Sequence, residues 1–311
     1  MSDVVVSPCY IGIDVGGSKI AAGIVALPEG RVVARRRQAS GCARGGEAVL
    51  RDVMLMAEDL RDEGKRAGLC PTAIGVGVAE LVDRCGAVVS DATIGWRGLA
   101  VRERVGALLP AVVEADVRAA ALAEARLGAG GAFSSFVFVT IGTGISSCLV
   151  LGGVPVTGSR GLAGTLASGP VLAVGPEGEL VSGLPLERYA SGPALVARLN
   201  QVRPGRVQTG REVAELAATG DAAALGVCQT AGRAAGAAIA QLINVLDPDA
   251  VIVGGGLGLS GGAHWDSLQV SAHTLVWSDV HRDIPVLSAR LGHDAGWIGA
   301  AIAAAQRGRP L

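Results

Sequence analysis

The sequence has few aromatic residues and very few lysines. Its 311 residues include three Phe, four Trp and two Tyr, so the abundant Ala, Val, Leu and Ile must build the core. Positive charge is nearly all arginine, because Lys19 and Lys65 are the only lysines. The formal net charge of −1 gives no reason to expect a nucleic acid or an anionic membrane as partner. A lysine inside a glycine-rich loop therefore stands out.

The sequence also lacks paired cysteines and long apolar runs. Its six cysteines are scattered and form no CxxC pair, so neither a zinc-ligand spacing nor a disulfide framework is indicated. No apolar run reaches membrane-spanning length, and the N-terminus shows no charged-then-apolar leader. We expect a cytoplasmic protein with no membrane partner.

Short β-branched runs alternate with Ala- and Leu-rich stretches along the chain. This pattern predicts the α/β class, with sheets covered by helices. The strand candidates are 10–14, 20–26, 73–78, 111–114, 136–141, 147–151 and 250–253, and the helix candidates are 48–67, 116–129, 193–199, 222–246 and 296–307.

Two segments of the chain share one design, an apolar strand, a tight glycine loop and a second apolar strand. They read "CYIGIDVGGSKIAAGIVA" and "FVFVTIGTGISSCLVLGG". The repeat predicts two similar domains that face each other, at 1–115 and 116–295, and the C-terminal helix at 296–311 can cross back onto the first. The alternative is that such hairpins are common in α/β enzymes and carry no duplication.

The first hairpin places an acid, Asp14, next to a loop of Gly16, Gly17, Ser18 and Lys19. Glycines leave backbone N–H groups open to an anion, and the Ser and Lys side chains add donors. A plain Gly-Gly turn is the alternative. A turn does not explain Asp14, because a buried carboxylate is costly unless it is paired. An acid beside a phosphate loop suits the water shell of Mg²⁺.

The second hairpin offers hydroxyl and backbone donors. Thr140, Gly142, Thr143 and Gly144 belong to it, and a pair of such hairpins on opposing domains is enough to hold a triphosphate. A third glycine cluster ends the strand candidate at 250–253 and allows a base and a ribose to lie against the backbone. It consists of Gly254, Gly255 and Gly256, and a simple strand-to-helix turn is its alternative.

Asp116 is the candidate catalytic base. It follows a strand and precedes an Ala-rich helix, so a helix N-cap is its simplest role. Phosphoryl transfer needs positioning, charge neutralisation and one carboxylate that accepts the proton of the acceptor hydroxyl. Asp116 lies at the inferred domain joint, where a cleft would form, so both roles remain open.

Taken together, these motifs resemble the ROK family (repressors, open reading frames and kinases) of the sugar kinase/actin-like ATPase superfamily. The resemblance spans nearly the whole chain. It implies two RNase H-like domains, ATP and Mg²⁺ in the cleft, transfer of phosphate to a hexose hydroxyl, usually at C6, and a homodimer. The matching segments are "IGIDVGGSK", "GVGVAELVDRCGAVVSDATIGWRG", "VVEADVRAAALAEARLG", "VTIGTGI", "GLAG", "LERYASG", "LDPDAVIVGGG" and "DAGWIGAAIAA".

The resemblance assigns a role to each motif. It makes Asp116 the catalytic base, Asp14 with residues 16–19 the first phosphate motif, residues 142–144 the second and residues 254–256 the adenosine motif. Glu187 stands where the family has a sugar-contacting carboxylate.

The departures from the family pattern affect the sugar and zinc sites. Ala115 replaces an Asn that normally holds sugar hydroxyls, and Thr165 and Ser168 replace a Glu and a His after "GLAG". The usual zinc loop aligns with residues 178–185, which contain no cysteine. Because all four zinc ligands are missing together, we predict no zinc.

Glu80 stands where the family usually has a glycine close to the sugar. A carboxylate there would pair well with an ammonium group. We therefore predict a non-standard acceptor, first an amino hexose resembling kanosamine. The alternatives are a cyclitol, plain glucose as in a glucokinase, and a Glu80 that merely points to solvent. The phosphate donor also stays open among ATP, another nucleotide and polyphosphate.

A function of another class remains, a catalytically idle sugar sensor that keeps the fold. The lost sugar contacts favour it. The intact Asp116 and both phosphate loops oppose it, because a sensor has no need of the machinery for transfer.

Overall fold

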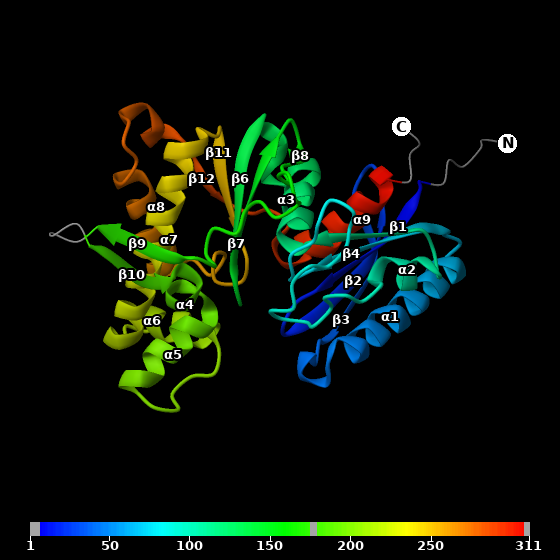
Figure 1. Ribbon diagram of the computed structural model, residues 1–311, viewed down its shortest axis with the longest axis horizontal. Coiled ribbons are helices and arrows are strands. Elements are labelled where there is room, and N and C mark those ends of the chain that lie inside the picture. Colours follow the sequence, from blue (N-terminus) through cyan, green and yellow to red (C-terminus); the bar gives the residue numbers. More distant parts are fainter. Residues whose placement is uncertain (1–6, 175–178, 308–311) are drawn as a thin grey trace. The chain divides into compact units, whose positions relative to one another are not determined.

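The computed structural model describes residues 7–174 and 179–307 (Figure 1). Helices pack on two mixed sheets, which confirms the predicted α/β class. The chain divides into two compact units, each with its own core, and each is described by itself below. Unit 1 comprises Met1–Gly131, Gly153–Ala163 and His293–Leu311, and unit 2 comprises Ala132–Gly152 and Gly164–Gly292.

Unit 1 is built on a sheet with the strand order β3-β2-β1-β4-β5 (Figure 1, blue to green). β1 is antiparallel to β2 and parallel to β4. The inner strands are buried along almost their whole length, because helices cover both faces. The strands are β1 (Cys9–Val15), β2 (Lys19–Ala26), β3 (Arg31–Ala39), β4 (Pro71–Val78) and β5 (Ala111–Ala115).

The C-terminal helix of unit 1 packs directly on this sheet. A Cβ atom built on Gly12 would lie 1.8 Å from the carbonyl oxygen of Trp297, and one on Gly75 equally close to that of Ala300. Glycine at both positions therefore lets the helix backbone approach the strands. The helices of unit 1 are α1 (Gly46–Arg66), α2 (Val101–Gly106), α3 (Asp116–Leu127) and α9 (Ala295–Arg307), with short 3₁₀ turns at Cys42–Arg44, Ala129–Ala132 and Gly292–Asp294.

The unit boundary differs from the sequence prediction at α3. The prediction ends the first domain at residue 115, whereas unit 1 continues through α3 to Gly131. The reason is packing, since α3 lies against α9: a Cβ atom on Gly299 would come within 1.7 Å of the carbonyl oxygen of Ala119. α9 itself lies in unit 1, with the N-terminal strands.

Unit 2 contains the second hairpin, β6 and β7, in a sheet of order β12-β11-β6-β7. β11 is parallel to β6 and β12, and β6 is antiparallel to β7. A separate ribbon pairs β9 with β10. The strands are β6 (Ser135–Ile141), β7 (Ile145–Leu151), β9 (Pro170–Val174), β10 (Leu180–Pro185), β11 (Ala250–Gly254) and β12 (Val286–Ser288); a two-residue strand, β8 (Val154–Pro155), follows β7 along the chain.

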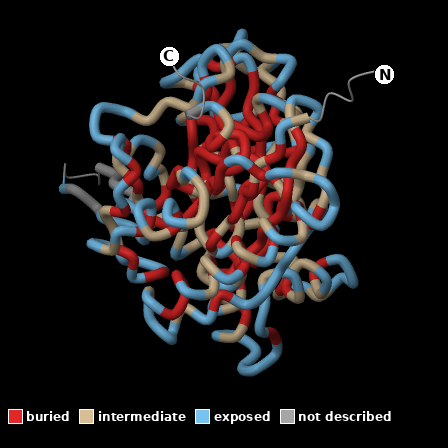
Figure 2. Tube along the Cα trace, turned by 90° about the vertical axis from the view of Figure 1, so that its right-hand side faces the viewer, coloured by how far each residue is buried: buried red, intermediate tan, exposed pale blue. Residues whose placement is uncertain are grey.

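The helices of unit 2 cover one side of its sheet and form most of its core. The long helix α7 contributes a buried stripe from Ala224 to Ile243. Figure 2 shows such buried stretches (red) running through the interior, with exposed residues in the connections. These helices are α4 (Leu186–Ala190), α5 (Gly192–Val202), α6 (Gly210–Ala218), α7 (Ala222–Leu246) and α8 (Gly262–Thr274), with a 3₁₀ turn at Asp279–Asp283.

No helix within the described ranges is long and apolar enough to cross a membrane.

Candidate active site

Asp14 lies near the end of β1 in a space that glycines leave open. A Cβ atom on Gly296, in the first turn of α9, would lie 2.6 Å from Asp14 Oδ2, and one on Gly77 would lie 3.7 Å from Oδ1. No hydrogen bond from the described residues reaches this carboxylate. Burial raises its pKa to about 6, and the positive charge of Lys19 opposes that rise.

These features fit a hydrated Mg²⁺. The carboxylate of Asp14 keeps its acceptor capacity, and a nearby cation would favour its charged form. Mg²⁺ is usually held by one or two carboxylates, waters and phosphate oxygens rather than by a full cage of protein ligands. Among the residues that the structure describes, no cluster of three or more His, Cys, Asp or Glu side chains could hold a metal ion.

The loop after Asp14 is held in place through its carbonyl groups. The N–H of Gly16 donates to the Lys19 carbonyl at 2.9 Å. Ser40 donates its hydroxyl to the Gly17 carbonyl at 2.7 Å and its N–H to the Ser18 carbonyl at 3.2 Å. Within the described ranges the N–H groups of Gly17 and Ser18 have no acceptor. They remain available to an anion.

Asp116 is the first residue of α3, so it is not the N-cap; Ala115 occupies that position. Its Oδ1 accepts a hydrogen bond from the N–H of Val117 at 2.7 Å. Burial raises the pKa of Asp116 to about 7, and the negative charges of Asp14 and Glu80 add to that rise. The Val117 hydrogen bond and the charge of Arg118 act in the opposite direction. The result is a carboxyl group that titrates near neutral pH.

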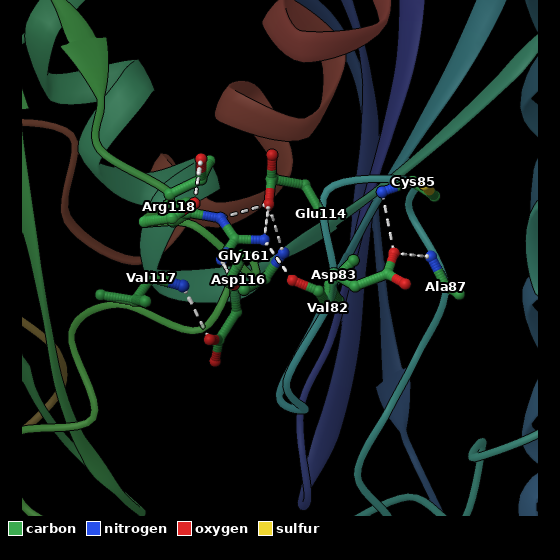
Figure 3. Close-up of polar contacts among 12 residues, drawn as sticks. Val82, Asp83, Cys85, Ala87, Glu114, Asp116, Val117, Arg118 and Gly161 are labelled. Carbon is green, nitrogen blue, oxygen red and sulfur yellow. Dashed lines mark hydrogen bonds and ion pairs between the residues drawn. The ribbon is translucent and has the colours of Figure 1, made fainter.

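A buried arginine fixes the junction at which Asp116 stands (Figure 3). Arg118 is 3% exposed and forms an ion pair with Glu114, which is four residues earlier. Its guanidinium also donates to the carbonyl of Val82 at 2.9 Å and to the carbonyl of Gly161. Arg118 thereby ties the β5–α3 junction to two loops of unit 1.

Glu80 is 7% exposed, and the loop after it surrounds its carboxylate. Oε2 accepts the hydroxyl of Ser90 and the N–H of Ala92, and Oε1 accepts the N–H groups of Thr93 and Ile94, at 2.5 and 2.7 Å. Both oxygens are thus engaged within unit 1. These bonds satisfy the buried acid without a substrate ammonium group, and they exclude the alternative of a solvent-facing side chain.

In unit 2 the second hairpin turns through residues 142–144. The N–H of Gly142 donates to the Gly144 carbonyl at 2.9 Å. Glu187, at the start of α4, accepts the N–H of Ile145 at 2.8 Å, and a Cβ atom on Gly144 would lie 2.8 Å from the same oxygen, Oε2. The structure therefore places Glu187 against the phosphate hairpin, a position that the sequence did not indicate.

The triple glycine packs on this hairpin. Gly254 pairs with Thr140 across the parallel strands β11 and β6. Gly255 has φ +82°, and a Cβ atom there would lie 2.4 Å from the carbonyl oxygen of Ile141, so only glycine fits. Leu257 donates its N–H to that same carbonyl at 2.9 Å. Residues 142–144 and 254–256, to which the resemblance assigns the phosphates and the adenosine, therefore lie side by side in unit 2.

A cavity of about 370 Å³ opens beside the hairpin. It offers the hydroxyl of Thr143, the charge of Arg188 and the N-terminus of α5, where Ser191 caps the helix by accepting the N–H of Ala194. Hydroxyl groups, a guanidinium and a helix N-terminus favour an anionic ligand, whereas the carboxylate of Glu187 in the same lining opposes one. The lining residues are Thr143, Glu187, Arg188, Ser191, Pro193 and Ala194.

The remaining predicted residues lie in loops of unit 2. Thr165 and Ser168 are exposed, in a loop whose Gly164 carbonyl accepts the N–H and the hydroxyl of Ser147. Of the segment 178–185 that replaces the zinc loop, residue 178 lies outside the described residues, and Leu180–Pro185 forms β10. The absence of zinc stays a prediction.

Sequence reasoning missed Arg118 and Ser191. Glu114 and Arg118 are four residues apart, one before and one after the start of the predicted helix, and this spacing could have indicated an ion pair. The Ser-Gly-Pro segment at 191–193 carries an N-cap residue followed by a proline in the first turn, which is a known helix-start signal.

Comparison with known proteins defines the class. Residues 10–307 match the model of the ROK family, so the chain belongs to the ROK family. It is 33% identical to the glucokinase of Streptomyces coelicolor, over 94% of this chain and 96% of that protein. It is 28% identical to an N-acetylmannosamine kinase of Escherichia coli, over 94% and 97% of the two chains.

The fold agrees with this assignment. A ROK family glucokinase of Streptomyces griseus, solved in complex with glucose and AMPPNP, superposes with a TM-score of 0.83 at 32% identity. The match covers 96% of this chain and 99% of that one. The structure therefore has the actin-like ATPase fold that the sequence resemblance implies.

Proposed function

We propose that this protein transfers the γ-phosphate of ATP to the primary, C6-type hydroxyl of a hexose. Its class, an ATP-dependent sugar kinase, follows from its family and from its sugar-kinase relatives. The acceptor and the roles of individual residues are the proposal.

The observation that carries the proposal is the state of Asp116. A general base works best when its pKa lies near the working pH. Burial and two neighbouring carboxylates raise the pKa of Asp116 to about 7. In the proposed step the sugar hydroxyl oxygen forms a bond to the γ-phosphorus while its proton passes to the Asp116 carboxylate. The bond between the γ-phosphorus and the bridging oxygen breaks, and ADP leaves with the electron pair.

The two hairpins supply the binding groups in this proposal. The free N–H groups of Gly17 and Ser18, with the charge of Lys19, would hold phosphate oxygens, and Thr143 would do so from unit 2. The turn at 254–256 would receive the adenosine. Asp14 would hold Mg²⁺ through water, and the bound ion would neutralise phosphate charge.

The hydrogen bonds of Glu80 change the order of the candidate acceptors. A carboxylate has about four lone-pair sites, and the loop at 90–94 fills them. An ammonium group would have to displace one of these donors. We therefore place glucose first and the amino hexose resembling kanosamine second. The replacement of the family's sugar-contacting residues by small or neutral ones still supports the amino hexose; these are Ala115, Thr165 and Ser168. A cyclitol is the third candidate.

An acceptor panel tests the proposal. ADP release is measured with glucose, kanosamine, N-acetylmannosamine and a cyclitol, for wild type and Asp116→Asn, with the exposed Asp59→Asn as matched control. We expect sugar-dependent turnover that is lost in Asp116→Asn alone. Absence of sugar-dependent turnover in all three proteins would refute the proposal and support the idle sugar sensor, whereas equal turnover in all three would refute Asp116 as the base. Preference for kanosamine over glucose would restore the amino hexose to first place.

The family resemblance also implies a homodimer, which we include in the proposal. Light scattering after size exclusion would check it, and a monomer at micromolar concentration would contradict it.

A further inference from the structure

Unit 1 holds a second cavity, of about 300 Å³, beside the edge of its sheet. Ala22 and Arg36 border it, and so do Lys19 and Ala21 of β2 together with Arg35 and Arg37 of β3. The strand register places these four side chains on one face, because Ala21 pairs with Arg37 and Gly23 pairs with Arg35. His293, Asp294 and Trp297, at the start of α9, close the other side.

The acid in this cavity is already engaged. Asp294 accepts Arg35 Nε at 2.9 Å through Oδ2 and the indole N–H of Trp297 at 3.0 Å through Oδ1. Arg36 is directed to the other face of the sheet, since it pairs with Glu63 of α1. The charge of Asp294 is therefore offset by Arg35.

Two further cations, Lys19 and Arg37, line the cavity from the same face of β2 and β3. Within the described part of the chain, no ion pair joins Lys19 or Arg37 to an acidic side chain. Burial lowers the pKa of Lys19 and the like charge of Arg37 lowers it further, whereas the charges of Asp14 and Asp294 act in the opposite direction. Lys19, Arg35 and Arg37 outnumber Asp294 in the lining of this cavity, and such an excess of positive charge attracts an anion. The helix dipole of α9, which begins at Ala295, acts in the same direction.

We propose that this cavity binds a small, multiply charged phosphate anion. Arginine guanidinium groups hold phosphate in bidentate fashion, and lysine adds a point charge. The aromatic side chain here, Trp297, is 1% exposed, so it offers no open face on which a nucleotide base could stack. The ligand is thus an inorganic condensed phosphate or a sugar phosphate rather than a second nucleotide. The site goes beyond the proposed kinase reaction.

Lys19 belongs to both the cavity and the first hairpin. An anion in the cavity therefore changes the charge next to the loop at 16–19, and it can alter nucleotide binding from there. Binding is measured directly, without turnover, so that failure of this inference and failure of the kinase proposal are distinguishable.

The test is calorimetry on the full chain with pyrophosphate, tripolyphosphate, glucose 6-phosphate and, as a general anion, sulfate. The variants are Arg37→Gln and Arg35→Gln. Arg31→Gln is the matched control, because Arg31 is exposed on the same strand, outside the cavity, and loses the same charge. A Trp297→Phe variant shows whether a fluorescence change on binding comes from this cavity.

We expect saturable binding of at least one phosphate ligand that is weakened about tenfold in Arg37→Gln, which corresponds to the loss of one charge-assisted contact. Arg31→Gln should bind within twofold of wild type. A preference for pyrophosphate or for glucose 6-phosphate identifies the source, and either supports the site.

Three results would overturn the inference. The first is no saturable binding of any phosphate ligand. The second is equal weakening in Arg37→Gln and Arg31→Gln, which would reflect net charge alone. The third is loss of binding under saturating AMPPNP without any effect of Arg37→Gln, because the anion would then occupy the nucleotide's own phosphate positions.

Discussion

The two hairpins have the same backbone plan and different chemistry. Each joins two apolar strands through three residues, at 16–18 in unit 1 and at 142–144 in unit 2, and each turn is closed by one backbone hydrogen bond of 2.9 Å. Two residues before the first glycine, unit 1 has Asp14 and unit 2 has Thr140. One position thus carries a charge in one hairpin and a hydroxyl in the other.

The surroundings extend this difference. Unit 1 collects carboxylates, since Asp14 and Glu80 both raise the pKa of Asp116. Unit 2 offers the hydroxyl of Thr143, the guanidinium of Arg188, a helix N-terminus and the glycine turn at 254–256, with Glu187 as the acid beside the hairpin. We infer that unit 1 carries the proton and metal chemistry, whereas unit 2 contributes mainly to holding the nucleotide.

The largest effect should come from the proposed base. Asp116→Asn removes the proton acceptor and should lower kcat about 10³-fold, within the range that general bases supply. In wild type, kcat/KM should fall as pH drops below about 7, the pKa of Asp116. Steady-state kinetics from pH 5.5 to 9 measure both. If Asp116→Asn kept more than a tenth of the wild-type kcat, Asp116 would not be the general base.

Asp14→Asn should have the next largest effect. The variant keeps the shape of the side chain and loses the charge that would hold Mg²⁺, so activity should drop about 100-fold. The concentration of Mg²⁺ needed for half-maximal rate should also rise. Titration of the rate with Mg²⁺ checks this, and the exposed Asp59→Asn provides the control. An unchanged Mg²⁺ requirement would show that Asp14 does not serve the metal.

Arg118→Gln should move the pH profile. The charge of Arg118 lowers the pKa of Asp116, so its loss should shift the acidic limb of kcat/KM to higher pH and lower activity about tenfold. Arg118→Lys keeps the charge and should restore the limb, although the bonds to Val82 and Gly161 weaken. If Arg118→Gln lowered the melting temperature but did not shift the acidic limb of the kcat/KM profile, the role of Arg118 would be purely structural.

Asp116 should also make stability depend on pH. A folded-state pKa above the ordinary value means that the group favours folding while protonated, and this contribution is lost as pH rises from about 4 through about 7. Asn cannot ionise. The free energy of unfolding of Asp116→Asn, relative to that of wild type, should therefore be higher at pH 8 than at pH 5 by on the order of 1–2 kcal/mol. Urea unfolding at both values measures it. A constant difference would contradict the raised pKa.

The smallest effect should come from the second hairpin. Thr143→Val keeps the volume of the side chain and removes one neutral hydroxyl donor, so KM for ATP should rise about threefold to tenfold at nearly constant kcat. Initial rates against ATP concentration separate the two constants. A fall in kcat as large as that expected for Asp116→Asn would contradict the assignment of catalysis to unit 1 and of nucleotide binding to unit 2.

Much of the fold could be predicted from sequence, because β1, β2, β4 and β6 are apolar runs, and β1 and β6 end directly in glycine loops. β3 was missed, since "RVVARRRQA" is an exposed edge strand with charges on both faces and no apolar alternation. The short helices α4 and α6 and the ribbon of β9 and β10 also lack a long periodic signal.

Asp14 could be predicted as a candidate because an acid inside an apolar segment needs a reason to be there, and Asp116 because of its place at the inferred domain joint and the family resemblance; their roles stay predictions. The bonds around Glu80 could not, since its partners come from an irregular loop 10 to 14 residues away. The same holds for Arg118 and the Gly161 carbonyl, which are 43 residues apart. Such contacts depend on the tertiary conformation of the loops, which the periodicity of the sequence does not indicate.

The most direct measurement is a crystal structure of the protein with AMPPNP, Mg²⁺ and the preferred hexose. The account predicts that the phosphates contact both the loop at 16–19 and the hairpin at 142–144, and that an Asp116 oxygen lies about 2.6–3.2 Å from the sugar's primary hydroxyl. Phosphates bound by one hairpin alone, or an Asp116 side chain directed away from the sugar, would contradict it.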